Sequence, residues 1–424
     1  AGFGFSPNGQ ICLSSLGIQG YQEVVHPFHN LVRMNREGQV RQESNVLKRM
    51  SDKHGFGIAG CLRADLIDLL KEPLVVNNNN SNSNNNDSVL KYSHRLSHIE
   101  QDTEKVSVQF ENGLEETFDL VLGADGINST VAEQLNIDHS PPIYSGANIF
   151  YGVIPTTTTN SNHPDGLVYK DFQNPLLKRR NCVIQGPGTG EVIFFRVGPE
   201  EREHLVWAVT YRSPAPPPKS TEWQPHQGDT NSDQQQQEQM QRDALQMVLD
   251  QYPASHPIHE ASAMTHADRL LHFGLFYRNH KRIWSKGRVC LMGDACHAVL
   301  PYAGQGANQA IEDAIVMANC LSNQFGPTEP QLKIEHAFQE FYKQRSKRTQ
   351  RVVNLANFMD KLYHSENRLV HIFLDFFLTQ FLRGGFIFKQ IEKELIEECP
   401  IQDWDHYRPF RKMKLKVSCE AKNQ

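Results

Sequence analysis

The chain has 424 residues, enough for two domains or one large discontinuous domain, and 39% of them are hydrophobic, which supports a core. The formal net charge of −5 gives no basic surplus, which argues against a nucleic-acid-binding protein. The eight cysteines have no paired spacing, so we expect neither a disulfide framework nor a zinc site, but a reducing, cytoplasmic location. No signal peptide and no uninterrupted apolar run of about 18 residues is visible.

The first residues predict a short helix. Pro7 and Asn8 are typical of a helix start, and Gly17 is typical of its end. Gly2 and Gly4 precede this helix as a GxG pair. They do not form a dinucleotide-binding fingerprint, because the upstream strand and the third glycine are missing.

A second helix is predicted from apolar residues on one face: Leu62, Leu66, Leu69 and Leu70. Arg63 lies near its start and, as a planar, permanently charged donor, suits a phosphate or hydroxyl ligand. The alternative is a surface ion pair with Asp65 or Asp68. The following segment, 76–87, is almost entirely Asn and Ser and predicts a disordered insertion.

Strands dominate the middle of the chain. Leu120 to Leu122 predicts a buried strand that ends in a tight loop, Gly123 to Asn128. Between 141 and 265, apolar runs separated by Gly, Pro and Asn turns predict a mostly antiparallel sheet. The candidate pocket residues, each with ordinary core packing as the alternative, are Phe194, Phe195, Trp207, Tyr211, His272 and Tyr277.

The stretch Gly287–Ala314 has the order strand, acidic tip, glycine loop, helix. Arg288 to Met292 predicts a buried strand, and Gly293-Asp294 places a carboxylate at its C-terminal end, where ligands bind in open α/β sheets. Pro301, Gly304 and Gly306 let the backbone approach a ligand closely. We expect a helix to start at Asn308, and its N-terminus favours an anion or an electron-rich ring edge.

The last part of the chain predicts helices. Lys333 to Leu362 has long amphipathic spacing, and the charge run Lys343 to Arg351 predicts a solvated helix face. His371 to Ile391 is rich in Phe and Leu but carries charges and a Gly pair. It predicts either a helix docked on the rest of the protein, which we favour, or an interfacial helix that makes peripheral membrane contact.

The stretch Gly287–Ala314 resembles, without a gap, the second flavin-binding motif of FAD-dependent aromatic monooxygenases. These are the salicylate hydroxylase-like, zeaxanthin epoxidase-like and p-hydroxybenzoate hydroxylase-like enzymes. The resemblance implies that Asp294, after Gly293, holds hydroxyls of the FAD sugar-alcohol chain, and that Pro301 fixes the turn beneath the ring. It also implies that the residues facing the flavin ring are Gly304, Gly306, Ala307 and Asn308.

Two further motifs resemble the same family. Asp125 and Gly126 match its Asp-Gly motif, which touches the FAD pyrophosphate region and the nicotinamide cofactor. Arg63 matches the Arg of an RxxL helix that contacts FAD. At the position of an Arg that usually follows the Asp-Gly motif the chain has Ala132, which weakens the case for NADPH contact. The family's first unit, with its GxGxxG turn, would precede Gly2, so we expect either a fragment or a poor flavin binder.

The expected fold is therefore α/β: a Rossmann-like FAD-binding domain without its N-terminal unit, an inserted β-rich substrate domain and C-terminal helices. Residues 1–140 and 266–330 would form the FAD-binding domain. Residues 141–265 would form the substrate domain, with a disordered Gln-rich insertion near 213–241, and residues 331–424 the helical region.

The resemblance implies a hydroxylase or epoxidase that uses FAD, NADPH or NADH, and molecular oxygen. Oxygen would reach a small aromatic or conjugated substrate through a flavin C(4a)-hydroperoxide. The sequence singles out no catalytic acid or base, His297 is expected to be structural, and no metal is expected. The alternatives are a truncated or degenerate, non-catalytic family member and a flavoprotein reductase of the same fold.

Overall fold

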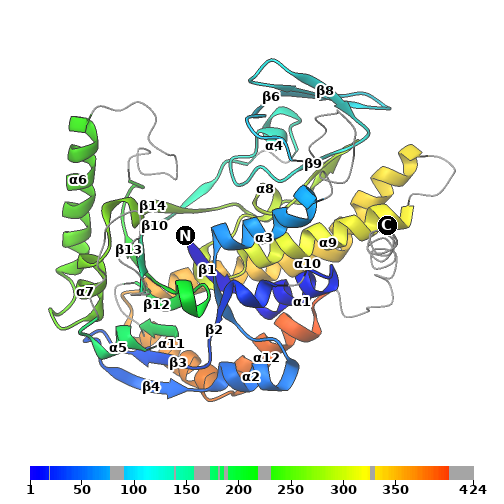
Figure 1. Ribbon diagram of the computed structural model, residues 1–424. Helices are drawn as coiled ribbons and strands as arrows, with labels where there is room; N and C mark the ends of the chain where they lie inside the picture. Colours follow the sequence, from blue (N-terminus) through cyan, green and yellow to red (C-terminus); the bar gives the residue numbers. More distant parts are fainter. Residues whose placement is uncertain are drawn as a thin grey trace.

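The computed structural model describes residues 1–400, apart from 19, 77–89, 138–139, 157–171, 180–181, 186–189, 218–230 and 325–329. Within these residues the strands form four sheets, and helices cover both faces of the largest one (Figure 1). The predicted α/β class and the predicted C-terminal helices are confirmed. The Asn-rich tract after Val76 lies outside the described residues.

The largest sheet has seven strands in the order β14-β10-β13-β12-β11-β3-β4. Neighbouring strands are antiparallel, except that β11 runs parallel to β3. The sheet extends beyond the predicted substrate segment 141–265, because β3, β4 and β14 come from outside it. Its strands are β3 (Leu31–Met34), β4 (Val40–Ser44), β10 (Ile143–Pro155), β11 (Cys182–Gln185), β12 (Val192–Val197), β13 (His204–Arg212) and β14 (Leu270–Tyr277).

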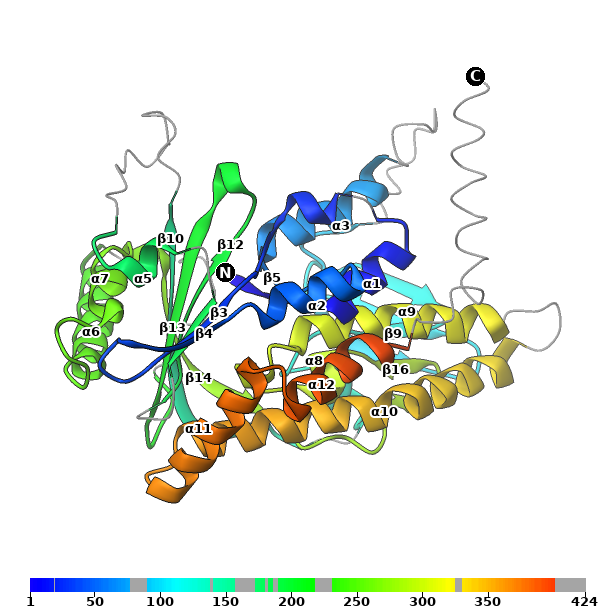
Figure 2. The ribbon, with the colours of Figure 1, turned by 90° about the horizontal axis from the view of Figure 1, so that it is seen from below.

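Successive side chains of a strand point to opposite faces of the sheet, so the two faces of this sheet pack against different neighbours. On β13, Trp207 and Val209 pack in the cluster beneath α6 (Asn231–Leu249) and α7 (Pro257–Ala263), whereas Ala208 packs on the opposite face with Leu300. The short helix α5 (Pro175–Lys178) lies on the same side as α6 and α7 (Figure 2). The face of Ala208 therefore points toward the glycine loop.

The predicted disorder of the Gln-rich segment is wrong where the structure describes it, since residues 231–241 form the first half of α6. Glutamine is a good helix former, and the buried apolar stripe of Leu245, Val248 and Leu249 anchors the second half of the helix on the sheet. Tertiary packing of one half thus extends the helix into a polar segment. Residues 218–230 lie outside the described part of the chain.

A small sheet carries two of the predicted motifs. It consists of β15 (Ser285–Lys286), β16 (Val289–Leu291) and β9 (Val121–Gly123), in that order. The predicted buried strand before Gly293 is confirmed by β16, whose residues are all buried. The strand predicted at Leu120 to Leu122 is β9, one residue later and only half-buried at its first two positions, because β9 is the edge strand. The helix α4 (Thr130–Gln134) follows β9.

The N-terminal residues build a third sheet, β1-β5-β2, from β1 (Gly2–Phe5), β2 (Val25–Pro27) and β5 (Ala59–Leu62). The helices predicted at Pro7 and near Arg63 are confirmed as α1 (Pro7–Ser15) and α3 (Arg63–Val76), and α2 (Val46–His54) lies between them in the chain. The fourth sheet is the meander of β6 (Leu96–Gln101), β7 (Val106–Phe110) and β8 (Glu115–Phe118).

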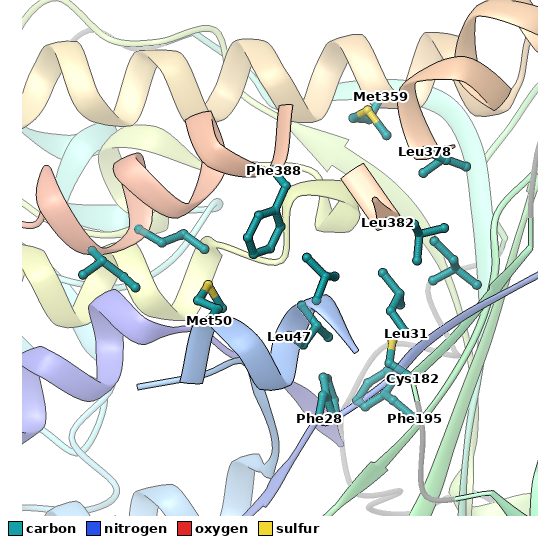
Figure 3. Packing of buried hydrophobic residues seen from close by; sticks show 14 of the residues in the cluster. Phe28, Leu31, Leu47, Met50, Cys182, Phe195, Met359, Leu378, Leu382 and Phe388 are labelled. Carbon is teal, nitrogen blue, oxygen red and sulfur yellow. The ribbon is translucent and has the colours of Figure 1, made fainter. Parts of the chain in front are cut away.

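Long helices close the molecule. The helices α9 (Gly306–Gln324) and α10 (Pro330–Tyr363) pack together, and α11 (Arg368–Leu382), α12 (Phe386–Glu392) and the short η6 (Lys393–Glu397) follow. Side chains of α10, α11 and α12 converge with residues of the N-terminal half in one apolar cluster (Figure 3). In it, Phe388 of α12 lies near Leu47 and Met50 of α2, and Leu382 of α11 lies near Leu31 of β3. This cluster ties the two ends of the described chain together.

By length and composition, no single described helix passes as a candidate membrane span. One bent pair passes when taken together, namely Arg368–Leu382 with Phe386–Glu397, which meet at 64°.

Candidate functional site

The two predicted ligand motifs end neighbouring parallel strands. In the pairing of β16 with β9, Leu291 lies opposite Gly123, so both strands deliver their C-terminal loops to the same edge of the sheet. Gly293 follows β16 with a φ of 56°, a conformation that favours glycine, and Asp294 begins the short helix α8 (Asp294–His297). The Asp294 side chain is exposed at this edge. The structure therefore brings the Gly-Asp motif and the Asp-Gly motif together.

The glycine loop lies between α8 and α9. Pro301 starts a single turn of 3-10 helix, η5 (Pro301–Ala303), which ends at Gly304 with a φ of 60°. A side chain at Gly304 would meet no atom within 4 Å, so open space lies beside its backbone. The predicted start of the next helix at Asn308 is corrected: α9 begins at Gly306, because the chain turns helical immediately after the loop. Gly306, Ala307 and Asn308 form its first turn.

Asn308 holds the loop rather than extending its side chain toward solvent. It is fully buried, and its Nδ2 donates to the Gly304 carbonyl at 3.0 Å and to the Gly4 carbonyl at 3.1 Å. Its Oδ1 accepts from the Ser6 N–H at 3.0 Å. The side chain thus joins the glycine loop to the end of β1.

Asp125 and Arg63 have different surroundings. Asp125 is exposed, and its Oδ2 accepts from the Val131 N–H at 3.1 Å, which caps α4. Gly126 follows with a φ of 81°. Arg63 is the exposed first residue of α3, and it starts from β5, in a different sheet from the two motifs. The predicted alternative partners of Arg63 pair elsewhere: Asp65 with Arg202, and Asp68 with Lys71.

A buried ionic network that sequence reasoning missed lies beneath the Gly-Asp turn. Asp313 Oδ2 accepts from the Gly293 N–H at 2.9 Å and lies 2.6 Å from His297 Nε2. Asp313 Oδ1 accepts from Arg345 Nε at 2.7 Å. Arg345 also contacts Glu312. The α9 carboxylate of Asp313 therefore fixes the turn that presents Asp294.

The other half of the network reaches the N-terminal helix. Arg348 donates from Nε and Nη2 to the Glu312 carboxylate, each at 2.8 Å, and Asn8 of α1 donates to the same carboxylate at 2.6 Å. Arg345 is fully buried, and Arg348 nearly so. The predicted solvated face for Lys343 to Arg351 is therefore wrong at these two arginines, because they face the acidic pair on α9. The signal was the pair Glu312-Asp313 on an otherwise uncharged helix.

Burial alone would raise the pKa of Asp313, but His297 and Arg345 outweigh it and lower the pKa to about 2. Burial also opposes ionisation of Glu312, and Arg345 and Arg348 reverse that effect and lower its pKa. Cys296, His297 and Asp313 lie close enough together to suggest a metal site. His297 and Arg345 already occupy both oxygens of Asp313, which accounts for the grouping without a metal ion.

A second polar group lies between the glycine loop, the large sheet and the end of α10, and we call it the Tyr302 cluster: Tyr302, His364, Asp360, Arg212, Glu191 and Thr210. The Tyr302 hydroxyl lies 2.9 Å from His364 Nε2, and Arg212 Nη2 lies 3.4 Å from Asp360 Oδ2. The Asp360 and His364 side chains are buried. The cluster lies beside the sheet face that carries Ala208.

Burial lowers the pKa of His364 to about 3, with a smaller contribution from Arg212, so its imidazole is neutral. Burial raises the pKa of Glu191 to about 7. Within the described residues, three atoms in the last two turns of α10 and just after it have no hydrogen-bond partner: Asn357 Oδ1, Asp360 Oδ1 and His364 Nδ1. The cluster thus retains unused hydrogen-bonding capacity next to the glycine loop.

The predicted pocket aromatics divide between the two sheet faces. Tyr277 packs with Leu300 and the glycine loop, on the face of the Tyr302 cluster. Phe194 and Trp207 belong to the core on the far face, and Phe195 belongs to the cluster of Figure 3. Tyr211 and His272 stack around Phe150. Ordinary core packing thus accounts for the aromatic residues apart from Tyr277.

The residues fit a flavin nucleotide. Asp294 is an exposed carboxylate at the edge that β16 shares with β9, the backbone at Gly304 is open, and the 19-residue helix α9 begins two residues after Gly304. Such a helix N-terminus favours partial negative charge, and a carboxylate accepts from sugar hydroxyls.

The profile of a family described as "FAD binding domain" matches residues 84–353, more than half of the chain. The chain belongs to the FAD-dependent aromatic monooxygenases. Among curated relatives, 6-hydroxynicotinate 3-monooxygenase of Pseudomonas fluorescens is 25% identical over 76% of this chain and 72% of its own length. The enzyme of the same name from Bordetella bronchiseptica is 26% identical, over 66% of this chain and 62% of its own length. Salicylate hydroxylase of Pseudomonas putida is 24% identical, over 87% of this chain and 79% of its own length.

Solved structures of this family share the fold. Klebsiella pneumoniae HpxO, complexed with FAD and uric acid, has a TM-score of 0.67 at 20% identity, over 94% of this chain and 87% of that one. The 2,6-dihydroxypyridine-3-hydroxylase of Arthrobacter nicotinovorans has a TM-score of 0.61 at 14% identity, over 88% and 86%. The predicted family and its cofactor FAD are therefore confirmed.

Proposed function

We propose that this protein is a monooxygenase that consumes NADPH or NADH and inserts one atom of molecular oxygen into a small aromatic or conjugated ring. The observation that carries the proposal is the shared strand edge at which Asp294 and the Asp125 loop meet, with α9 beside it, since a side chain at Gly293 would lie 3.4 Å from Ala310 of α9. Bound FAD would supply the redox chemistry, taking two electrons from the nicotinamide and activating oxygen. The second oxygen atom would leave as water.

In this proposal each motif has one task. Asp294 accepts hydrogen bonds from the sugar-alcohol chain, and Asp125, Gly126 and Arg63 lie along the nucleotide. The first turn of α9 faces the pyrimidine edge of the ring and stabilises its negative charge. Pro301 and Gly304 shape the loop beneath the ring. Asn308 holds that loop through its side chain.

The test has two stages. The purified chain is incubated with excess FAD, free flavin is removed, and the absorption spectrum is recorded. Flavin-loaded protein is then supplied with NADPH or NADH, labelled oxygen and a panel of hydroxylated aromatic rings. Label in the product supports a monooxygenase, whereas nicotinamide oxidation without label on any substrate would favour a reductase. If flavin is kept neither by this chain nor by one extended with the family's GxGxxG unit, the assignment of the cofactor site is contradicted.

Replacing Asp294 tests the proposed FAD site separately from the proposed substrate site. Asp294→Ala removes a charged acceptor at the strand end, and a hydrogen bond to a charged group contributes about 1.5–3 kcal/mol, so FAD should bind about 10- to 150-fold more weakly. Because Asp294 is exposed, the fold should be retained. Titration of FAD followed by fluorescence gives the affinity. Asp268→Ala, at another exposed carboxylate, is the control, and equal affinities in the two variants would remove Asp294 from the site.

The substrate ring is proposed to lie between the Tyr302 cluster, the sheet face of Ala208 and the glycine loop. The buried carboxylate of Asp360 pairs with the Arg212 guanidinium, Glu191 lies near Tyr302, and the unpartnered oxygens of Asn357 and Asp360 are acceptors. Such a surface suits a ring that brings hydrogen-bond donors, namely hydroxyl or amino groups. Relatives named for hydroxylated substrates, 6-hydroxynicotinate and 3-amino-4-hydroxybenzoate, support this class.

Asp360→Asn should therefore weaken binding of a hydroxylated ring about tenfold or more, because a charged acceptor becomes neutral. Binding of its methyl ether, which has no donor, should change little. Both affinities are measured by perturbation of the flavin spectrum. Glu335→Gln, an exposed change on the same helix, is the control. A uniform loss for both ligands would indicate altered structure instead of lost recognition.

A further inference from the structure

The helix α11 is apolar on two opposite faces. Leu374, Leu378 and Leu382 are buried and join the cluster of Figure 3. The other face exposes large apolar side chains, with exposed fractions of 73% for Leu369 and 58% for Ile372. A soluble helix usually presents polar residues on its outer face. The outer face of α11 is therefore apolar, unlike that of a helix whose outer face contacts only solvent.

The exposed side chains form one outer apolar patch, which comprises Phe358, Leu369, Ile372, Phe373 and Phe376. The spacing of its α11 members places them on one side of the helix. Phe358, from the end of α10, extends the patch, since its ring centroid lies 6.4 Å from that of Phe373. Figure 2 shows α11 at the periphery of the molecule. Contiguous exposed apolar surface of this kind marks an interaction site.

The charges around the patch are mainly positive. Exposed arginines, Arg368 and Arg383, stand at the two ends of α11. Its one acidic residue, Asp375, is paired with Arg33 at 2.5 Å. Lys361, three residues after Phe358 on α10, is a third exposed cation, and the exposed Glu366 precedes Arg368. Basic side chains next to an apolar helix face are attracted to anionic lipid headgroups.

We propose that the outer apolar patch binds the surface of an anionic lipid bilayer, with α11 lying along the interface. The face of α11 that carries Leu374, Leu378 and Leu382 is packed in the core, so only the outer face can enter the lipid. A second copy of the chain fits less well, because a two-fold contact of the patch with itself would bring the cationic ends of the two helices together. Apolar burial and headgroup attraction then act together, as stable anchoring requires.

The test is vesicle co-sedimentation of the full chain. The probes are vesicles of phosphatidylcholine alone and vesicles that also contain phosphatidylserine. We expect binding to the anionic vesicles that weakens as salt is added. The double variant Phe373→Ser, Phe376→Ser should bind at least tenfold more weakly. Leu114→Ser, which removes an exposed apolar side chain from the β7–β8 turn, should bind like the wild type.

The charges are tested separately. The double variant Arg368→Gln, Arg383→Gln should lose affinity for anionic vesicles and keep its affinity for phosphatidylcholine. Each variant is checked by circular dichroism, and all the substituted side chains are exposed, so folding should be unaffected. Equal binding by the wild type and the double Phe variant, or no binding of the wild type to anionic vesicles, would overturn the proposal. Loss of a dimer in the double Phe variant, without vesicle binding, would assign the patch to self-association.

Discussion

Arg345→Met should destabilise the protein by about 3–5 kcal/mol at neutral pH, the usual cost of removing one partner from a buried ion pair. The substitution leaves the Glu312 and Asp313 carboxylates buried, with the Arg348 guanidinium and the His297 ring among their remaining partners. Equilibrium unfolding in urea, followed by circular dichroism, gives the free energy of unfolding. Arg351→Met is the matched control on the same helix, because Arg351 is half-exposed and its surface pairs contribute little.

The loss of stability caused by Arg345→Met should also depend on pH. In the wild type the pKa values of Glu312 and Asp313 lie below their ordinary values of 4.5 and 3.8, so the unfolded chain takes up protons first as the pH falls. The stability that these carboxylates confer is complete above those ordinary values and is lost as the pH falls toward about 2, the folded pKa of Asp313. Without Arg345, burial should raise both pKa values. The difference in the free energy of unfolding between the wild type and the Arg345→Met variant should therefore become smaller as the pH falls below neutral.

A difference of less than about 1 kcal/mol between Arg345→Met and the wild type would contradict the role of the network, since that is the range of exposed pairs. Arg345→Lys separates charge from geometry. Lysine keeps the positive charge but cannot reproduce the forked contacts of Arg345 with Asp313, Glu312 and Gln309, so an intermediate loss is expected.

The same network shows what the sequence could not predict. The period of Lys333 to Leu362 predicts α10, because apolar spacing specifies a helix locally. It does not reveal which polar residues face another helix, since Arg345 and Arg348 are buried only when α9 presents Glu312 and Asp313 across the contact. The charge run Lys343 to Arg351 therefore predicted solvent at Arg345 and Arg348, which are buried, and it was right at Lys343, Lys347 and Arg351, which are exposed. Contacts with residues far away in the sequence determine whether a charged side chain is buried or exposed.

The strand-end motifs were more predictable. The short apolar run before Gly293 and the one before Gly123 specify strands, and turn residues specify their loops. That these two strands run parallel and side by side follows from their pairing, which no local pattern encodes. The Tyr302 cluster was missed for a related reason, because it joins residues of the loop, the sheet and the end of α10. Only the fold brings Tyr302, Asp360 and Glu191 together.

Asn308→Ala should have the second large effect, on stability and on flavin binding together. It leaves the Ser6 N–H without its acceptor and the Gly4 carbonyl without its donor, at a site where Asn308 is fully buried. An unsatisfied buried group costs about 1–3 kcal/mol, so the variant should lose about 2–4 kcal/mol. Loosening Gly304 should also weaken FAD binding. Urea unfolding and FAD titration are measured on the same sample.

The control for this variant is Asn354→Ala, an exposed asparagine on α10, which should change neither quantity measurably. Asn308→Asp refines the argument, because it keeps the acceptor for Ser6 but loses the donors to Gly4 and Gly304. If the Asp variant binds FAD as weakly as the Ala variant, the contact with Gly304 fixes the loop. If instead the Ala variant is less stable but binds FAD as the wild type does, Asn308 supports the fold alone, and the loop keeps its shape without it.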